Sequence, residues 1–167
     1  EQKMIDGKWY YFETQTGAMV TGWYDLPGKR VYYGSDGAMR YGQQKIDGKF
    51  YCFDSQSGAM ITGWYDLPEK RVYYGSDGAM WYDQKLIDGK WYYFDIQTGA
   101  MSIVWFTLPG KRVYYGTDGS MSYGQLQLVV TFYYFSIHIC TMISGWFDVL
   151  GYGFYFGLDC VVLFCQL

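Results

Sequence analysis

Large aromatic side chains recur at fixed spacing along this chain, and they are the residues best suited to recognise a ligand. A tryptophan that follows glycine in three of its four copies returns every 41 residues: Trp23, Trp64, Trp105 and Trp146. A second aromatic position has the same period: Trp9, Phe50, Trp91 and Phe132. Electron-rich rings around a small cavity attract a quaternary ammonium by cation–π contact, roughly 0.5–2 kcal/mol per ring. Flat rings along a groove would instead stack on sugars, and rings between packed hairpins would bind nothing, so the pattern alone fits three arrangements.

Residue types that carry catalysis or bind metals are sparse. The single histidine, His138, stands where other repeats have glutamine, and the recurring aspartates lie in turn sequences, where Asp bonds its own backbone. The cysteines show no C-x-x-C spacing and replace Tyr or Gly of other repeats: Cys52, Cys140, Cys160 and Cys165. We expect them to be unpaired, with a disulfide or metal site as the alternative. The sequence predicts no enzyme, no cofactor and no catalytic or metal-binding residue.

Charge and hydropathy exclude two classes of partner. The net charge is −3 with acids and bases interleaved, which predicts no nucleic-acid binding. No run of 18 apolar residues occurs in the apolar C-terminal region, which predicts no membrane insertion. The chain begins within the repeat pattern, at Glu1-Gln2-Lys3, so we expect a piece of a longer protein.

The elements that position the rings are two unequal hairpins per 41 residues. The first turns at Asp6-Gly7, a type I′ signal, and returns through residues 8–12. Alternation along this return strand places Trp9 and Tyr11 on one face and Tyr10 and Phe12 on the other. Both faces are aromatic, so both need cover, which stacked hairpins would provide.

The second hairpin runs from Thr21 to Tyr33 and turns at Pro27-Gly28, which fits a type II turn. The second copy has Pro68-Glu69 at this turn. Glutamate disfavours the positive φ that type II requires, so we expect type I there.

The period indicates an all-β repeat β-solenoid of stacked β-hairpins, about eight hairpins in four units. We expect one repeat domain over residues 1–167, with units at approximately 1–41, 42–82, 83–123 and 124–167. The last unit is degenerate: Val129-Val130 replaces the Asp-Gly turn. Either it caps the stack, or the residue identities in 124–167 are misassigned, because Asp to Val and Gly to Cys preserve side-chain outline.

Three motifs together resemble the cell-wall-binding repeats of Gram-positive surface proteins, phage endolysins and autolysins, which include the choline-binding modules. They are Gly22-Trp23, Trp9-Tyr10-Tyr11-Phe12 and Gly17-Ala18-Met19, with Gly63-Trp64 and Gly58-Ala59-Met60 as second copies. Related repeats occur in glucan-binding domains and in clostridial toxins. The resemblance implies a left-handed β-solenoid, secreted to the cell wall or cell surface, with ligand sites between successive hairpins.

The resemblance also implies the site residues. Each site would combine the Gly-Trp tryptophan, the aromatic that opens the Trp-Tyr-Tyr run, a neighbouring tyrosine and a methionine. The corresponding positions are Trp9, Trp23, Tyr33, Phe50, Trp64, Tyr74, Trp91, Trp105, Tyr115, Trp146, Met19, Met60 and Met101. One departure matters. The hairpins that contain the Gly-Trp tryptophan, which we call Trp23-type hairpins, have valine where the Trp-Tyr-Tyr run would start: Val31, Val72 and Val113. No single hairpin therefore contains both the Gly-Trp tryptophan and the aromatic residue that opens the run. A cage must then take Trp9 and Trp23 from adjacent hairpins, or exist only at alternate interfaces.

The resemblance therefore implies a non-catalytic module that recognises the choline of teichoic acids and anchors an attached protein. Weak sites repeated along a stack gain avidity from high effective concentration. Two alternatives stay open: binding of α-glucan or wall polysaccharide, and a structural spacer whose edges pair chains into a homo-oligomer.

Overall fold

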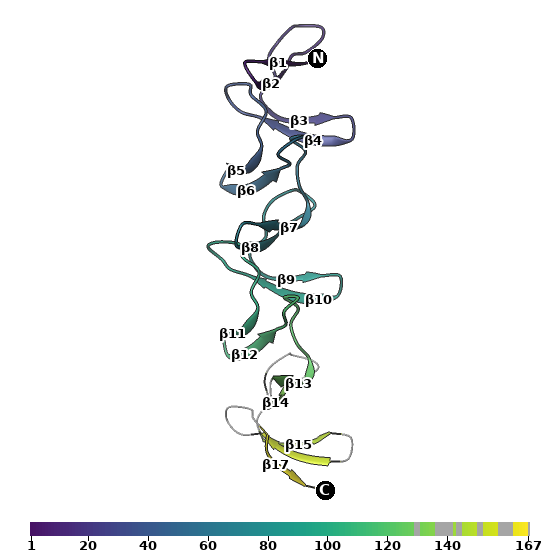
Figure 1. Cartoon of the computed structure of the whole chain (residues 1–167), viewed down its shortest axis with the longest axis vertical. Coiled ribbons are helices and arrows are strands. Elements are labelled where there is room, and N and C mark those ends of the chain that lie inside the picture. The colour runs from purple at the N-terminus through teal and green to yellow at the C-terminus, as the bar shows by residue number, and fades with distance from the viewer. Residues whose placement is uncertain (129–130, 136–141, 143–144, 150–151, 157–161, 167) are drawn as a thin grey trace. The chain divides into compact units, whose positions relative to one another are not determined.

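Every regular element of the protein is a β-strand. The computed structural model describes residues 1–128, 131–135, 142, 145–149, 152–156 and 162–166, with side chains for residues 1–123 and 142. The described residues form seven two-stranded antiparallel sheets and one three-stranded sheet, and they contain no helix (Figure 1). The predicted all-β fold of repeated hairpins is confirmed.

The chain divides into two compact units, residues 1–81 and residues 82–167. The first unit contains four hairpins: β1 (Gln2–Ile5) with β2 (Lys8–Tyr11), β3 (Gly22–Leu26) with β4 (Lys29–Tyr33), β5 (Gly42–Ile46) with β6 (Lys49–Phe53), and β7 (Gly63–Leu67) with β8 (Lys70–Tyr74). The second unit pairs β9 (Asp83–Ile87) with β10 (Lys90–Phe94), β11 (Val104–Leu108) with β12 (Lys111–Tyr115), and β13 (Gly124–Leu128) with β14 (Thr131–Phe135). Its last sheet joins β15 (Gly145–Val149), β16 (Tyr152–Phe156) and β17 (Val162–Gln166).

The Asp-Gly turns have the geometry expected from the sequence. Asp6 has φ 50° and Gly7 has φ 76°, so both central residues are in the left-handed region that type I′ requires. The second and third copies repeat this, with Asp47 at 49° and Asp88 at 48°. The turn fixes the register, which pairs Met4 with Trp9 and Gln2 with Tyr11.

The prediction of a type I turn at Pro68-Glu69 is wrong. Glu69 has φ 68°, whereas the corresponding position of a type I turn has a negative φ. Its counterpart Gly28 has φ 76°, and the flanking strands pair in the same register in both hairpins. The paired strands therefore hold the glutamate in a conformation that costs a residue with a β-carbon about 1–2 kcal/mol.

A second left-handed position recurs where the first strand of a hairpin begins. Gly22, Gly42 and Gly63 occupy it with φ between 62° and 82°. The third copy has Asp83 at 64° and Val104 at 65° instead. Val104 is the more strained of these two, because β-branched residues rarely adopt positive φ.

Methionines link successive hairpins through the backbone. Met39 forms an isolated bridge with Tyr33 of its own hairpin, and its N–H donates to the Trp9 carbonyl of the preceding hairpin at 2.8 Å. Met60 repeats the arrangement, donating to the Arg30 carbonyl at 2.7 Å. Within each of the two units, a backbone hydrogen bond from a methionine thus joins adjacent hairpins, and side chains pack around it.

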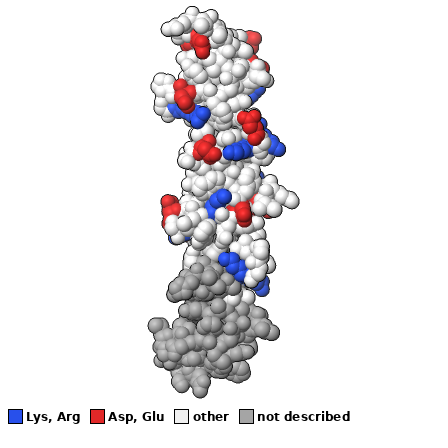
Figure 2. Space-filling model, turned by 180° about the vertical axis from the view of Figure 1, so that it is seen from behind, with Lys and Arg blue, Asp and Glu red and all other residues white. Residues whose placement is uncertain are grey.

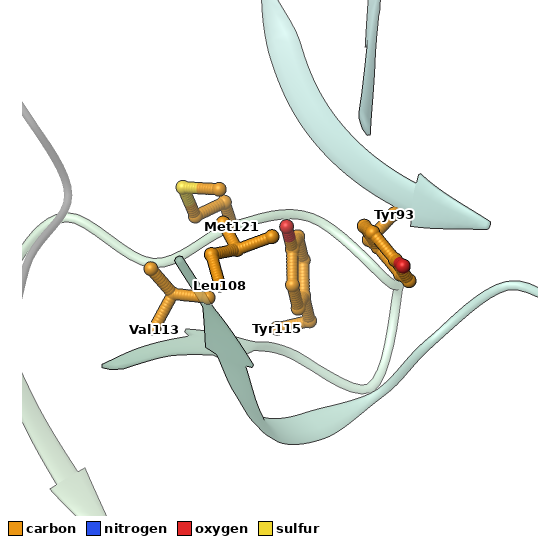
Figure 3. Packing of buried hydrophobic residues seen from close by; sticks show 5 residues of the cluster. All are labelled: Tyr93, Leu108, Val113, Tyr115 and Met121. Carbon is orange, nitrogen blue, oxygen red and sulfur yellow. The ribbon is translucent and has the colours of Figure 1, made fainter. Parts of the chain in front are cut away.

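The core lies on one face of the β3–β4, β7–β8 and β11–β12 hairpins. Val31 and Tyr33 are fully buried there and pack with Met39, and Trp9 and Tyr11 of the preceding hairpin cover them. In the second unit the equivalent cluster contains Tyr93, Leu108, Val113, Tyr115 and Met121. Figure 3 shows Tyr93 facing the Tyr115 ring from the neighbouring hairpin. On the face seen in Figure 2, acidic and basic side chains are interspersed and form no large group of one sign, in agreement with the interleaved charges of the sequence.

Candidate ligand-binding site

The opposite face of the β3–β4 hairpin carries a half-exposed group of aromatic rings. Trp23 on β3 is paired across the hairpin with Tyr32 on β4, and their ring centroids are 5.1 Å apart at 73°. The next hairpin, β5–β6, adds Tyr51 at 4.8 Å and 71°, and Phe53 at 5.7 Å and 45°. We call Trp23, Tyr32, Tyr51 and Phe53 the Trp23 cluster. Phe53 is buried, whereas the other three rings are partly open to solvent.

The tryptophan–tyrosine pair of this cluster recurs in the later copies. Trp64 and Tyr73 have centroids 5.1 Å apart at 84°, and Trp105 and Tyr114 are 5.1 Å apart at 73°. In the second copy Trp81 also lies on Tyr73, with centroids 4.6 Å apart at 34°. The tryptophan–tyrosine pair is therefore repeated with the sequence period, and Trp81 is an addition of the second copy.

An arginine covers the tryptophan in each of these copies. The guanidinium carbon lies 5.0 Å from the ring centroid for Arg30 on Trp23, 5.0 Å for Arg71 on Trp64, and 4.6 Å for Arg112 on Trp105. These distances are within the range of a cation–π contact. Arg30 also pairs with Asp25 at 3.5 Å, as Arg71 does with Asp66.

The register corrects the expected alignment of the two hairpin types. Counted from the turns, Lys8 matches Lys29 and Trp9 matches Arg30, not Val31. Backbone hydrogen bonds support this alignment. The Met39 N–H donates to the Trp9 carbonyl, and the Met60 N–H donates to the Arg30 carbonyl, so Trp9 and Arg30 hold equivalent positions. The position that holds an aromatic ring in one hairpin type therefore holds arginine in the other.

The structure does not bring Trp9 and Trp23 together, which corrects the predicted cage. Trp9 packs on the Val31–Tyr33 face of the β3–β4 hairpin, whereas Trp23 extends from the opposite face to Tyr51. Adjacent residues of a strand point to opposite faces, so Trp23 cannot join the side chains around Tyr24. The Trp23 cluster thus lies where β3–β4 meets β5–β6, whereas Trp9 packs where β1–β2 meets β3–β4.

The other aromatic residues of the Trp9 type have surroundings of their own where the structure describes their side chains. Phe50 is half-buried beneath the Lys45 ammonium, 5.5 Å from its ring centroid. Trp91 is one of the exposed large side chains, at 37%. The side chains of Trp146 and Phe132 lie outside the described residues.

The predicted tyrosines are on the core side of their hairpins. Tyr33, Tyr74 and Tyr115 have no exposed surface, so they cannot contact a ligand in this structure. The Gln43 side chain donates a hydrogen bond to the buried Tyr74 hydroxyl at 3.2 Å. Burial raises the pKa of the Tyr33 hydroxyl. The tyrosines beside tryptophan are instead the preceding residues, Tyr32, Tyr73 and Tyr114. Counting outward from the Pro-Gly turn, which places Trp23 opposite Tyr32, would have identified them.

The predicted methionines cover glycines of the following loops. The Met19, Met60 and Met101 side chains lie over Gly37, Gly78 and Gly119, respectively. The Met60 backbone also contacts two strands of the Trp23 cluster, through a bridge to Phe53 and a hydrogen bond to the Arg30 carbonyl. The methionines thus pack beside the aromatic interfaces.

Other kinds of site have little support in the described residues. No group of three or more His, Cys, Asp or Glu side chains gathers there. Cys52 is a buried free thiol whose pKa burial raises, in agreement with the expected unpaired state. His138 and the other three cysteines lie outside the described residues or side chains. Within the same part of the chain, no helix has the length and apolar character needed to cross a membrane.

Comparison with known families identifies the repeat. A family model described as choline-binding repeat matches residues 20–63 and 61–106, and a cell wall binding repeat model matches residues 3–19. The first model alone covers more than half of the chain. A comparison with curated protein sequences gave no match.

Solved structures give the same result. Choline-binding protein F from Streptococcus pneumoniae, crystallised with a peptidoglycan analogue, is 31% identical with a TM-score of 0.79, over 93% of this chain and 55% of that chain. Its complex with ipratropium matches at 30% identity and a TM-score of 0.78, over 93% and 57%. CbpJ from Streptococcus pneumoniae, at 23% identity and a TM-score of 0.68 over 96% and 86%, supports the fold alone. The chain spans little more than half the length of choline-binding protein F. On the match over residues 20–106, the chain belongs to the choline-binding repeat family.

Proposed function

We propose that this chain binds choline of cell-wall teichoic acids at the Trp23 cluster and its repeats. The observation that carries the proposal is the meeting of Trp23, Tyr32 and Tyr51 from two hairpins, with the two tyrosine centroids within 5.1 Å of the tryptophan. Both tyrosines are steeply inclined to the indole, so the rings form walls rather than a parallel stack. A quaternary ammonium gains cation–π energy from several such walls at once, because its charge is spread over its methyl groups.

The relatives support the ligand class. Choline-binding protein F forms a complex with ipratropium, whose charge is a quaternary ammonium, and was also crystallised with a peptidoglycan analogue. The same chemistry in this chain would direct it to a choline-bearing wall polymer. The chain would then act at the cell surface, outside the cell.

Repetition of the site would raise the affinity of the proposed module for a polymer. The Trp–Tyr pair occurs in three described copies at one spacing. A polymer that carries many choline groups can occupy several weak sites together, and the second binding event then takes place at high effective concentration. We propose that such avidity anchors an attached protein to the wall.

Calorimetric titration of the chain with choline tests the proposal. Tyr51→Ala removes one wall of the Trp23 cluster, and we expect it to abolish choline binding at this cluster while the repeats elsewhere keep theirs. Tyr10→Ala is the matched control, because Tyr10 holds the position of Tyr51 in the first hairpin but lies outside the Trp23 cluster. Thermal unfolding of both variants shows whether each remains folded. Heat from dextran and none from choline would instead assign the rings to glucan binding, and heat from neither would contradict both ligands.

A further inference from the structure

We infer that Arg30, Arg71 and Arg112 determine ligand specificity, selecting choline that still carries its phosphate over free choline. The inference rests on the proposed function, since it assumes that the ammonium enters the aromatic clusters. It concerns the residue that covers each tryptophan ring.

The arginine position is fixed by the hairpin. Arg30 is directly opposite Asp25 in the β3–β4 register, and two residues along β4 from Tyr32, so Arg30, Tyr32 and Trp23 share one face. The guanidinium carbon lies 5.0 Å from the Trp23 centroid, while 49% of the side chain remains exposed. The charged group is therefore both on the ring and within reach of a ligand.

A cation on the tryptophan ring changes what the cluster can accept. Free choline carries only positive charge, so it meets the repulsion of the arginine and competes with it for the ring. Phosphocholine joins its ammonium to a phosphate through a short ester bridge. When the ammonium lies between the rings, the phosphate can reach the guanidinium, whose planar fork binds phosphate oxygens in pairs.

The third copy lacks the aspartate opposite the arginine. Asp25 and Asp66 offset Arg30 and Arg71, but Thr107 occupies that position opposite Arg112. Thr107 is uncharged, and Arg112 lies closer to its tryptophan, at 4.6 Å. We therefore expect the preference for phosphocholine to be strongest at Trp105.

Titration calorimetry with choline and with phosphocholine tests the inference on the full chain. For the unmodified protein we expect phosphocholine to bind about tenfold more tightly, the size of effect that charge-assisted phosphate contacts support. In the triple variant R30A/R71A/R112A, choline should bind more tightly and phosphocholine more weakly, so that the ratio approaches one. The triple variant R30K/R71K/R112K should keep part of the ratio, because lysine retains the charge but not the planar fork.

The control is Arg40→Ala, which removes a guanidinium that pairs with Asp36 at 2.8 Å. It should leave the ratio unchanged. Equal binding of the two ligands by the unmodified protein, or a ratio unaffected by the alanine triple variant, would overturn the inference and leave choline binding intact. A failure of both ligands to bind would overturn the proposed function as well.

Discussion

The Met19 sulfur occupies the place that a β-carbon on Gly37 would need. The methionine of one loop thus closes over the glycine of the next, and the pairs Met60–Gly78 and Met101–Gly119 repeat the contact. Gly37 has φ 76°, so two separate constraints require glycine there. The Gly-Ala-Met motif and the Ser-Asp-Gly motif of the sequence are the two sides of one packing contact.

Gly37→Ala should therefore destabilise the protein by about 2–4 kcal/mol, from positive φ and overpacking together. Gly28→Ala is the matched control: Gly28 also has φ 76°, but no atom lies within 4 Å of a β-carbon built there. Gly28→Ala should lower the free energy of unfolding by only about 1 kcal/mol, the cost of positive φ for a residue with a β-carbon. Urea unfolding followed by tryptophan fluorescence measures both, and equal losses would contradict the packing contact.

Val104→Gly should stabilise the protein by about 1 kcal/mol, because it relieves a β-branched residue at φ 65°. The reciprocal change, Gly63→Val, places valine at φ 80° where nothing obstructs its β-carbon, so it should destabilise through the backbone alone. Thermal unfolding of the two variants checks the opposite signs. A destabilised Val104→Gly would show that the valine side chain contributes more than the strain removes.

Glu69→Gly should likewise raise stability by about 1 kcal/mol, since its counterpart Gly28 adopts the same turn without a β-carbon. Gly110→Glu, which puts glutamate at φ 73° in the third copy, is the reverse test. Denaturant midpoints provide the measurement. A loss of stability in Glu69→Gly would mean that the glutamate side chain makes a compensating contact.

Stability should fall between about pH 10 and pH 12. A hydrogen bond with Tyr11 and then burial raise the pKa of Tyr24 to about 12 from its ordinary 10.0. In this window the unfolded chain releases the tyrosine proton while the folded chain retains it, so rising pH favours unfolding. Burial shifts the pKa of Tyr33 and Tyr74 in the same direction.

Urea midpoints at pH 9 and pH 11 measure this loss, and Tyr24→Phe should reduce it. Lys8→Gln, on the exposed side of the first hairpin, should leave it unchanged. A midpoint in the unmodified protein that does not move over this range would contradict the raised pKa values.

The local structure could be predicted from the sequence because single dipeptides determine it. Asp6-Gly7 specified its turn through the need for two positive φ values, and alternation divided Trp9 from Tyr10 correctly. The type I prediction for the Pro68-Glu69 turn was wrong, because the pairing of whole strands outweighs the preference of glutamate for negative φ.

The site was predicted less well because a shift of one residue exchanges the faces of a strand. Tyr32 and Tyr33 look alike in sequence, yet one lies beside Trp23 and the other in the core. Aligning Val31 with Trp9 by their shared Tyr-Tyr neighbours concealed Arg30, which only the count from the turn places on Trp23. The packing between hairpins decides which face of one hairpin meets the next, and no single sequence motif specifies it.

The hydrogen bond between Met39 and the Trp9 carbonyl has a consequence for synthesis. Side-chain bonds between neighbouring hairpins join residues 28 to 37 positions apart, as from Lys29 to Ser57 and from Gln2 to Met39. The first core, from Trp9 to Tyr41, is thus complete once residue 41 has left the ribosome. Because each later repeat needs only the one before it, the sequence separation of contacts does not grow with chain length, and folding can keep pace with translation.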